Sequence, residues 1–376
     1  MMKREIREVV GVPTGILQSA EQLYKNLLNA FEDTNDMEFV FRGTFKEEFS
    51  FPTKFKINDL DITSVDVLVN YNVVENDKLE IAGAGYMGEL GVNYRRFMVI
   101  FMNEPNEVNL SMDFLIPNNR EVVFEELIEY MYENKALITS SLAHELKHAY
   151  DSFKRPNRKI TTQADYQANT TASGYGIGAF RKFYMMLYLA TTIEQLVKPT
   201  EVASRMDLGN IIQKDFLEFL LNDRTYKDFN DLRNYSMDEL ISDLLKQEKK
   251  LRSFDQFKDL PQDEFINQLL KVGYINLTQE KIDSVEEFVV RDNDRLLNMM
   301  GLDTPNMEYF LKQVNKYKKY ANNPQDFFTK EIKFLNIVGD KMIKKLGKLY
   351  SIANEDGSEQ ANIIKKIYNK VNHGQG

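Results

Sequence analysis

The chain has 376 residues, which is longer than a typical single domain, so we expect a core domain and at least one further unit. Hydrophobic residues make up 43% of the chain and charged residues 28%, which is ordinary for a folded protein and excludes wholesale disorder. The formal net charge of −9 argues against a surface built for nucleic acid. Because the chain has no cysteine, disulfides and thiolate chemistry are excluded, and any metal must be held by His and carboxylate groups.

The beginning of the chain indicates where the protein is expected to reside. The first five residues, Met1 to Glu5, lead into charge rather than into the apolar core of a signal peptide. No run approaches the roughly 18 consecutive apolar residues that span a bilayer. We therefore expect a chain without a signal peptide or membrane span that resides in the cytoplasm.

The first half of the chain changes its hydrophobic period twice. Residues 17–33 place Leu and Phe at helical intervals and predict a helix. Alternation from Val65 to Val73, a continuous apolar run at 95–102, and a second alternation over 107–115 that ends before Pro117 predict strands. We expect residues 37–116 to form a mostly antiparallel sheet.

From Glu121 onward the period is helical again. One helix is predicted near residues 123–131, and a second from Lys135 to Phe153, which ends before Arg155 and Pro156. The polar segment 154–178 is too long for a routine connection and predicts a mobile flap over the cleft, the alternative being a loop held permanently against the helical domain. Everything after Ala179 reads as helical. We predict an α+β fold in two domains, with residues 1–210 forming the α+β part and 211–376 a helical part.

Two of the three histidines lie one helical turn apart. His144, Glu145, Leu146, Lys147 and His148 form an HExxH motif inside the second predicted helix. Residues i and i+4 share a helix face, so both imidazoles can converge on one tetrahedral Zn²⁺. Glu145 lies at the neighbouring edge, where its carboxylate can accept a proton from water during metal-assisted hydrolysis.

The HExxH helix, preceded by a sheet, resembles the zincin metallopeptidases. The resemblance spans about residues 90–210 and implies a zincin-like core in which strand 107–115 is the edge along which an extended substrate aligns. Metzincins need Gly and His at the third and sixth positions after the second His, where this chain has Asp151 and Lys154. That subclass is excluded, and the third ligand is expected to be a carboxylate, as in gluzincins.

The third ligand is expected from a later helix. Pro199 and Thr200 can open such a helix, and the small residues Ala203 and Ser204 would let it approach the HExxH helix, so we favour Glu201. Only half of the gluzincin ExxSD pattern is present around it. The other acidic candidates are Asp151, Asp165, Glu194 and Asp207, of which Asp151 suits an orienting or capping role better.

Zincins commonly use a Tyr or His to stabilise the oxyanion of the transition state. The third histidine, His373, lies four residues from the end of the sequence, so Tyr175, Tyr166 and Arg205 are the candidates. For each of the three a purely structural role is favoured over this one, since glycine-flanked aromatic residues often only anchor a loop.

The leading hypothesis is a zinc-dependent endopeptidase that acts on a protein or peptide. His144, His148 and Glu201 would bind Zn²⁺, and Glu145 would be the general base. An alternative is a structural or assembly protein that keeps a zincin-like domain, since the chain is similar in style to zincin-like proteins of tailed bacteriophage virions. Its helical C-terminal domain would then bind an assembly partner. A toxin-type or regulatory protease that acts on one cellular protein would use the same residues.

Overall fold

The computed structural model describes residues 11–33, 39–75, 78–86, 106–154, 178–211, 213–289, 315 and 318–350. The chain divides into two compact units that interleave in sequence. Unit 1 comprises Met1–Lys154, Val197–Asp223 and Leu346–Gly376, and unit 2 comprises Arg155–Leu196 and Arg224–Lys345. This division differs from the predicted single boundary at residue 210, because the chain leaves unit 1 after Lys154 and returns to it at Val197.

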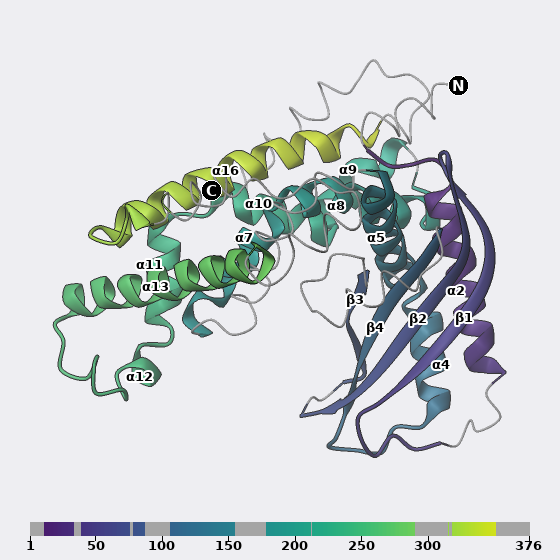
Figure 1. The fold of residues 1–376 in the computed structure, drawn as a ribbon, viewed down its shortest axis with the longest axis horizontal. Helices are drawn as coiled ribbons and strands as arrows, with labels where there is room; N and C mark the ends of the chain where they lie inside the picture. The colour runs from purple at the N-terminus through teal and green to yellow at the C-terminus, as the bar shows by residue number, and fades with distance from the viewer. Residues whose placement is uncertain are drawn as a thin grey trace. The chain divides into compact units, whose positions relative to one another are not determined.

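Unit 1 contains a four-stranded mixed sheet in the order β1-β2-β4-β3 (Figure 1). The strands are β1 (Phe45–Ile57), β2 (Leu60–Val74), β3 (Glu80–Tyr86) and β4 (Glu107–Pro117). β1 pairs antiparallel with β2 and β3 pairs antiparallel with β4, but β2 and β4 are parallel. Two of the three pairings are antiparallel, which confirms the prediction of a mostly antiparallel sheet, and the parallel pairing of β2 with β4 makes the sheet mixed. The predicted edge position of strand 107–115 is wrong, because β4 lies inside the sheet between β2 and β3.

The two predicted alternations are confirmed as strands with one buried face. Val65, Val67 and Val69 of β2 and Leu110 and Met112 of β4 are completely buried. Pro117 ends β4, as expected for a residue without a backbone N–H. The predicted strand at 95–102 lies outside the described residues.

Helices cover the buried face of the sheet. α2 (Ile16–Glu32) contributes Phe31, whose ring centroid lies 5.2 Å from that of Phe49 on β1. α4 (Phe124–Glu133) contributes Phe124, which contacts Tyr71 of β2 at 6.5 Å between centroids. A hydrogen bond from the Tyr24 hydroxyl to the carbonyl of Met131 joins the two helices at 3.0 Å.

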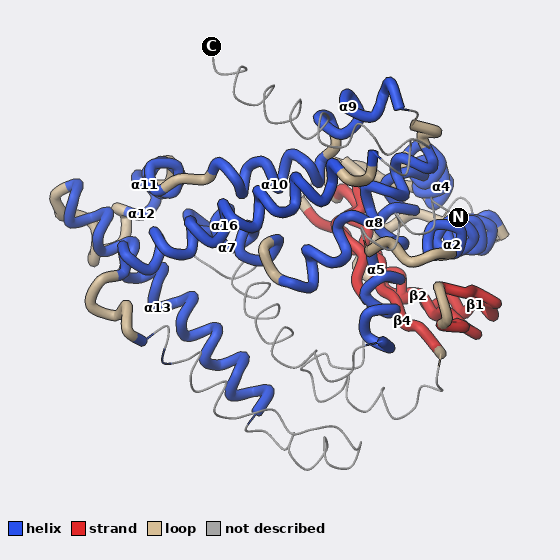
Figure 2. The backbone as a smooth tube through the Cα atoms, turned by 90° about the horizontal axis from the view of Figure 1, so that it is seen from above, coloured by secondary structure: helices blue, strands red, loops and turns tan. Residues whose placement is uncertain are grey.

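α5 (Lys135–Lys154) completes this layer and contacts β3 and β4 (Figures 1 and 2). The Tyr150 hydroxyl accepts a 2.9 Å hydrogen bond from the Asn58 amide, and Lys154 pairs with Asp59, so the β1–β2 turn holds the end of α5. The C-terminal end of the HExxH helix is thereby held against the β1–β2 turn. Gly15, which precedes α2, packs closely on Lys56 near the end of β1. A Cβ on Gly15 would lie 2.1 Å from the Lys56 carbonyl oxygen, so only glycine fits at this position.

Unit 2 is helical among its described residues. Besides the short η2 (Gly178–Phe180), its helices are α7 (Arg181–Leu189), α10 (Arg224–Asn234), α11 (Met237–Leu245), α12 (Glu248–Leu251), α13 (Gln262–Val289) and most of α16 (Pro324–Gly347). Aromatic rings fill its core, and Phe180 packs so closely on Gly273 that a Cβ there would lie 2.4 Å from the ring.

α8 (Thr192–Leu208) runs through the proline that was predicted to open a helix. Pro199 lies inside α8, so the predicted start is corrected to Thr192. Proline removes the hydrogen bond to the carbonyl four residues earlier, which is that of Gln195. In unit 2 this carbonyl accepts a 2.9 Å bond from Lys345 of α16, which compensates for the missing bond and lets the helix continue. α8 reaches unit 1 at Val197 and is followed there by α9 (Gln213–Asn222).

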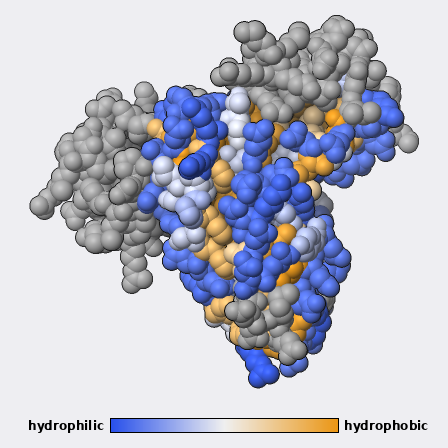
Figure 3. Space-filling model, turned by 90° about the vertical axis from the view of Figure 1, so that its right-hand side faces the viewer, coloured by the Kyte–Doolittle hydropathy of each residue, from blue (hydrophilic) through white to orange (hydrophobic). Residues whose placement is uncertain are grey.

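The described part of the surface is mainly polar on the face that Figure 3 shows. The face in Figure 3 is mostly hydrophilic, and hydrophobic residues show in narrow strips between hydrophilic ones. Among the helices of the described residues, none combines the length and apolarity that a membrane crossing requires.

Candidate metal centre

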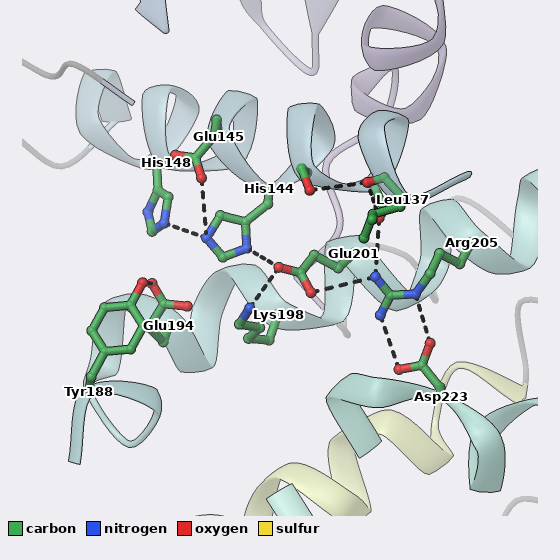
Figure 4. A network of polar contacts seen from close by, with 12 residues as sticks. Leu137, His144, Glu145, His148, Tyr188, Glu194, Lys198, Glu201, Arg205 and Asp223 are labelled. Atoms are coloured by element: carbon green, nitrogen blue, oxygen red, sulfur yellow. Dashed lines mark hydrogen bonds and ion pairs between the residues drawn. The ribbon is translucent and has the colours of Figure 1, made fainter. Parts of the chain in front are cut away.

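The two histidines of the motif face each other from adjacent turns of α5. Their Nε2 atoms lie 2.8 Å apart, and their rings are close to perpendicular, with 4.5 Å between centroids (Figure 4). His144 is 5% exposed and His148 is half-buried. The four-residue spacing on a helix explains this convergence, as the sequence predicts.

Glu145 lies next to the histidine pair. Its Oε1 is 3.8 Å from Nε2 of His144, and the residue is only 6% exposed. The nitrogen and oxygen donor atoms of His144, Glu145 and His148 all lie within 4.8 Å of one another. A buried carboxylate beside two imidazoles can accept and return a proton without leaving its place.

Glu201 reaches the same cluster from α8, but from the other side of the His144 ring. Its Oε1 lies 2.7 Å from Nδ1 of His144, the ring nitrogen that does not face His148 (Figure 4). Such a carboxylate orients an imidazole and fixes which of its nitrogens carries the proton. The structure thus brings together His144, His148 and Glu201, and it places Glu201 against the ring rather than beside the two Nε2 atoms.

Two cations flank Glu201 on its own helix. Lys198 Nζ lies 2.7 Å from Oε1 of Glu201, and Nη1 of Arg205 lies 3.6 Å from Oε2. Burial would raise the pKa of the Glu201 carboxyl, but the charges of Lys198 and His144 and the hydrogen bond from His144 hold that pKa well below its usual value. Glu201 is therefore an anion despite its burial.

Arg205 is itself held by an acidic partner. Its Nε and Nη2 bind the two carboxylate oxygens of Asp223 at 2.7 and 3.0 Å, and its Nη1 donates to the hydroxyl of Ser140 on α5 at 3.1 Å. Burial would lower the pKa of Arg205, but the bond to Asp223 and the charge of Glu201 raise it. The guanidinium of Arg205 is thus a fixed link between α5, α8 and the residue that follows α9.

The other predicted candidates divide into three groups. Asp151 pairs with Lys147 on α5, and Glu194, in unit 2, accepts a 2.8 Å bond from the hydroxyl of Tyr188. Asp207 is exposed. Tyr166, Tyr175 and Asp165, together with His373 and nearly all of the segment 154–178, lie outside the described residues, so their roles and the flap stay predictions.

The donor set suits a transition metal. Imidazole is a common ligand of Zn²⁺, and nitrogen ligands 2.0–2.1 Å from a tetrahedral ion lie about 3.3 Å apart. The two Nε2 atoms are 2.8 Å apart, so a small outward rotation of the side chains would give that spacing. The residues present therefore fit a metal ion.

Sequence reasoning missed part of the polar surroundings of Glu201. Lys198 precedes it by three residues and Arg205 follows it by four, and these helical spacings are a usable signal for ion pairs. Asp223 lies 18 residues beyond Arg205, directly after α9, and Ser140 lies 65 residues before Arg205 on α5. Their pairing with Arg205 depends on tertiary packing and leaves no local pattern in the sequence.

Comparisons with known proteins give no relative. No family model matches the chain, and no curated protein and no solved structure matches it.

Proposed function

We propose that the protein is a zinc-dependent peptidase of the zincin class, gluzincin-like in its ligands. The observation that carries the proposal is the convergence of two imidazole Nε2 atoms, 2.8 Å apart, beside the buried carboxylate of Glu145. A purely structural metal site has no need of such a carboxylate, whereas hydrolysis needs a group that moves a proton. The mixed α+β architecture is compatible with a zincin-like core.

His144 and His148 would hold the ion, and Glu201 would supply the third ligand. The two imidazoles face each other through their Nε2 atoms, and the Glu201 carboxylate contacts the His144 ring through Nδ1, so all three side chains meet at this ring.

Glu145 would carry the proton during hydrolysis. When bound, the ion would polarise the substrate carbonyl and lower the pKa of water. As the water oxygen bonds to the carbonyl carbon, the Glu145 carboxylate accepts the water proton, and it delivers that proton to the amide nitrogen as the C–N bond breaks. Its burial, with 6% exposure, keeps the carboxylate close to the reacting groups.

The test compares Glu145→Gln with the wild-type protein. Both are supplied with zinc and incubated with a mixture of unstructured peptides, and cleavage is followed by mass spectrometry. We expect the wild-type protein to cleave peptides, and Glu145→Gln to bind zinc normally but to cleave about 10²–10⁴ times more slowly, because the proton acceptor is lost.

A matched control is Glu125→Gln on α4, which removes an exposed carboxylate and should leave the rate unchanged. Full activity in Glu145→Gln would overturn the assignment of the general base. A wild-type protein that binds zinc and cleaves no peptide would instead favour the assembly role.

A further inference from the structure

The carboxylate of Glu201 has two oxygens with different partners. Oε1 faces His144 and Lys198, at 2.7 Å from each, and Oε2 faces Arg205 at 3.6 Å. The orientation of Glu201 toward His144 therefore depends on what holds the opposite oxygen. Arg205 lies one turn further along α8, where an i,i+4 pair faces the same side of the helix.

Arg205 is held far more firmly than a surface arginine. Its fork forms two hydrogen bonds with Asp223, whose side chain is 2% exposed, and a third with Ser140, a completely buried residue. A bidentate arginine–carboxylate pair fixes the guanidinium plane as well as its position. Because Ser140 also donates a 2.8 Å bond to the carbonyl of Leu137, its acceptor is fixed relative to the α5 backbone.

These contacts argue against a direct role of Arg205 in the reaction. Its hydrogen bonds go to Asp223 and Ser140, and it lies on the side of the Glu201 carboxylate that faces away from His144 (Figure 4). Arg205, which the sequence suggested as a candidate for oxyanion stabilisation, is instead hydrogen-bonded to Asp223 and Ser140. From that position it can orient the carboxylate of Glu201.

We propose that Arg205 and Asp223 are a positioning pair that fixes the Glu201 carboxylate toward His144 and thereby sets the metal affinity of the centre. The pair links α5, through Ser140, to α8, so it also fixes the spacing of the two helices that carry the three metal-binding side chains. This inference rests on the proposed function, because it assumes that the centre binds zinc.

The experiment measures the zinc dissociation constant by chelator competition and the visible spectrum of the Co²⁺-substituted protein. Arg205→Lys keeps the charge but loses the fork, and Asp223→Asn keeps the shape but loses the charge. We expect Arg205→Lys to bind zinc about 10–100 times more weakly and both variants to shift the Co²⁺ spectrum, as is typical when residues that orient ligands are changed. Ser140→Ala, which removes only one acceptor, should show a smaller loss in the same direction.

The matched control is Arg233→Lys in unit 2. Arg233 is 18% exposed, as Arg205 is, and its Nε binds Asp340 at 3.0 Å. We expect Arg233→Lys to lower thermal stability without changing zinc affinity or the Co²⁺ spectrum. Circular dichroism establishes that each variant is folded, and should Arg205→Lys not fold, Asp223→Asn and Ser140→Ala carry the test.

The outcomes separate the two proposals. Zinc affinity and a Co²⁺ spectrum equal to wild type in the folded Arg205, Asp223 and Ser140 variants would overturn the positioning role and leave the metal centre standing. An equal loss of affinity in Arg233→Lys would also overturn it, because the effect would then come from general destabilisation. A wild-type protein that binds neither Zn²⁺ nor Co²⁺ would overturn the proposed function and this inference together.

Discussion

Helices α2 and α5 both pack in unit 1, yet they bury different kinds of side chain. The residues that α2 buries are aliphatic, aromatic or Ala, with Ser19 as the one exception among them. α5 buries Thr139, Ser140, His144, Glu145 and Lys147. It also buries apolar residues, so its face is mixed where that of α2 is almost wholly apolar. Burying polar groups costs free energy unless they are hydrogen-bonded or paired. On α5, Ser140 and His144 have partners on α8, and Lys147 pairs with Asp151 of the same helix.

This difference explains what the sequence could predict. The bounds of α2 and the buried faces of β2 and β4 follow from apolar periodicity. The S-x-x-E spacing of Ser236 and Glu239 is typical of a capping box and forms one at the start of α11. The same spacing at Ser284 and Glu287 starts no helix, because α13 continues through it. Local patterns thus identify elements well where apolar burial decides the structure.

The site was predictable where its spacing is local. The four-residue separation of His144 and His148 was enough to place both imidazoles together. The contact of Glu201 with Nδ1 of His144 depends on how α8 packs on α5, and the pairing of Arg205 with Asp223 depends on how the end of α9 packs on α8. The parallel pairing of β2 with β4 likewise needs a long crossover that no local pattern specifies.

In the comparison of α5 with α2, the largest effect of a substitution is expected on zinc affinity, at Glu201. Glu201→Ala should weaken zinc binding by more than about 100-fold, because it would remove the proposed third ligand, whereas Glu194→Ala should change it little. Chelator competition measures both constants. A loss of only about 10–100-fold would assign Glu201 to the Nδ1 contact instead of ligation, and a larger loss in Glu194→Ala would move the ligand there.

The control for that prediction lies on α2. Leu23 is completely buried, and Leu23→Ala should lower the free energy of unfolding by about 2–5 kcal/mol while the folded protein binds zinc as tightly as wild type. Denaturant unfolding measures the free energy of unfolding, and chelator competition measures zinc affinity. Weaker zinc binding in this variant would show that the centre responds to any loss of stability in unit 1.

The smallest effect is expected at Thr139, where a substitution should raise the free energy of unfolding instead of lowering it. The Thr139 hydroxyl is buried and makes no hydrogen bond to the described residues. Thr139→Val should therefore stabilise the protein by about 1 kcal/mol. Thr278 on α13 is the control, because its hydroxyl donates a 2.6 Å bond to the Tyr274 carbonyl and Thr278→Val should destabilise. Destabilisation by Thr139→Val would mean that polarity at this position contributes to α5.

The metal content of untagged protein, measured by elemental analysis, tests the central claim that the polar face of α5 is a metal centre. We predict about one zinc per chain in the wild-type protein and none in the His144→Ala, His148→Ala double variant, because the two imidazoles would supply two of the three protein ligands. Folding of the double variant is checked by circular dichroism. Stoichiometric zinc retained in that variant, or a wild-type protein that takes up no zinc, would contradict the account.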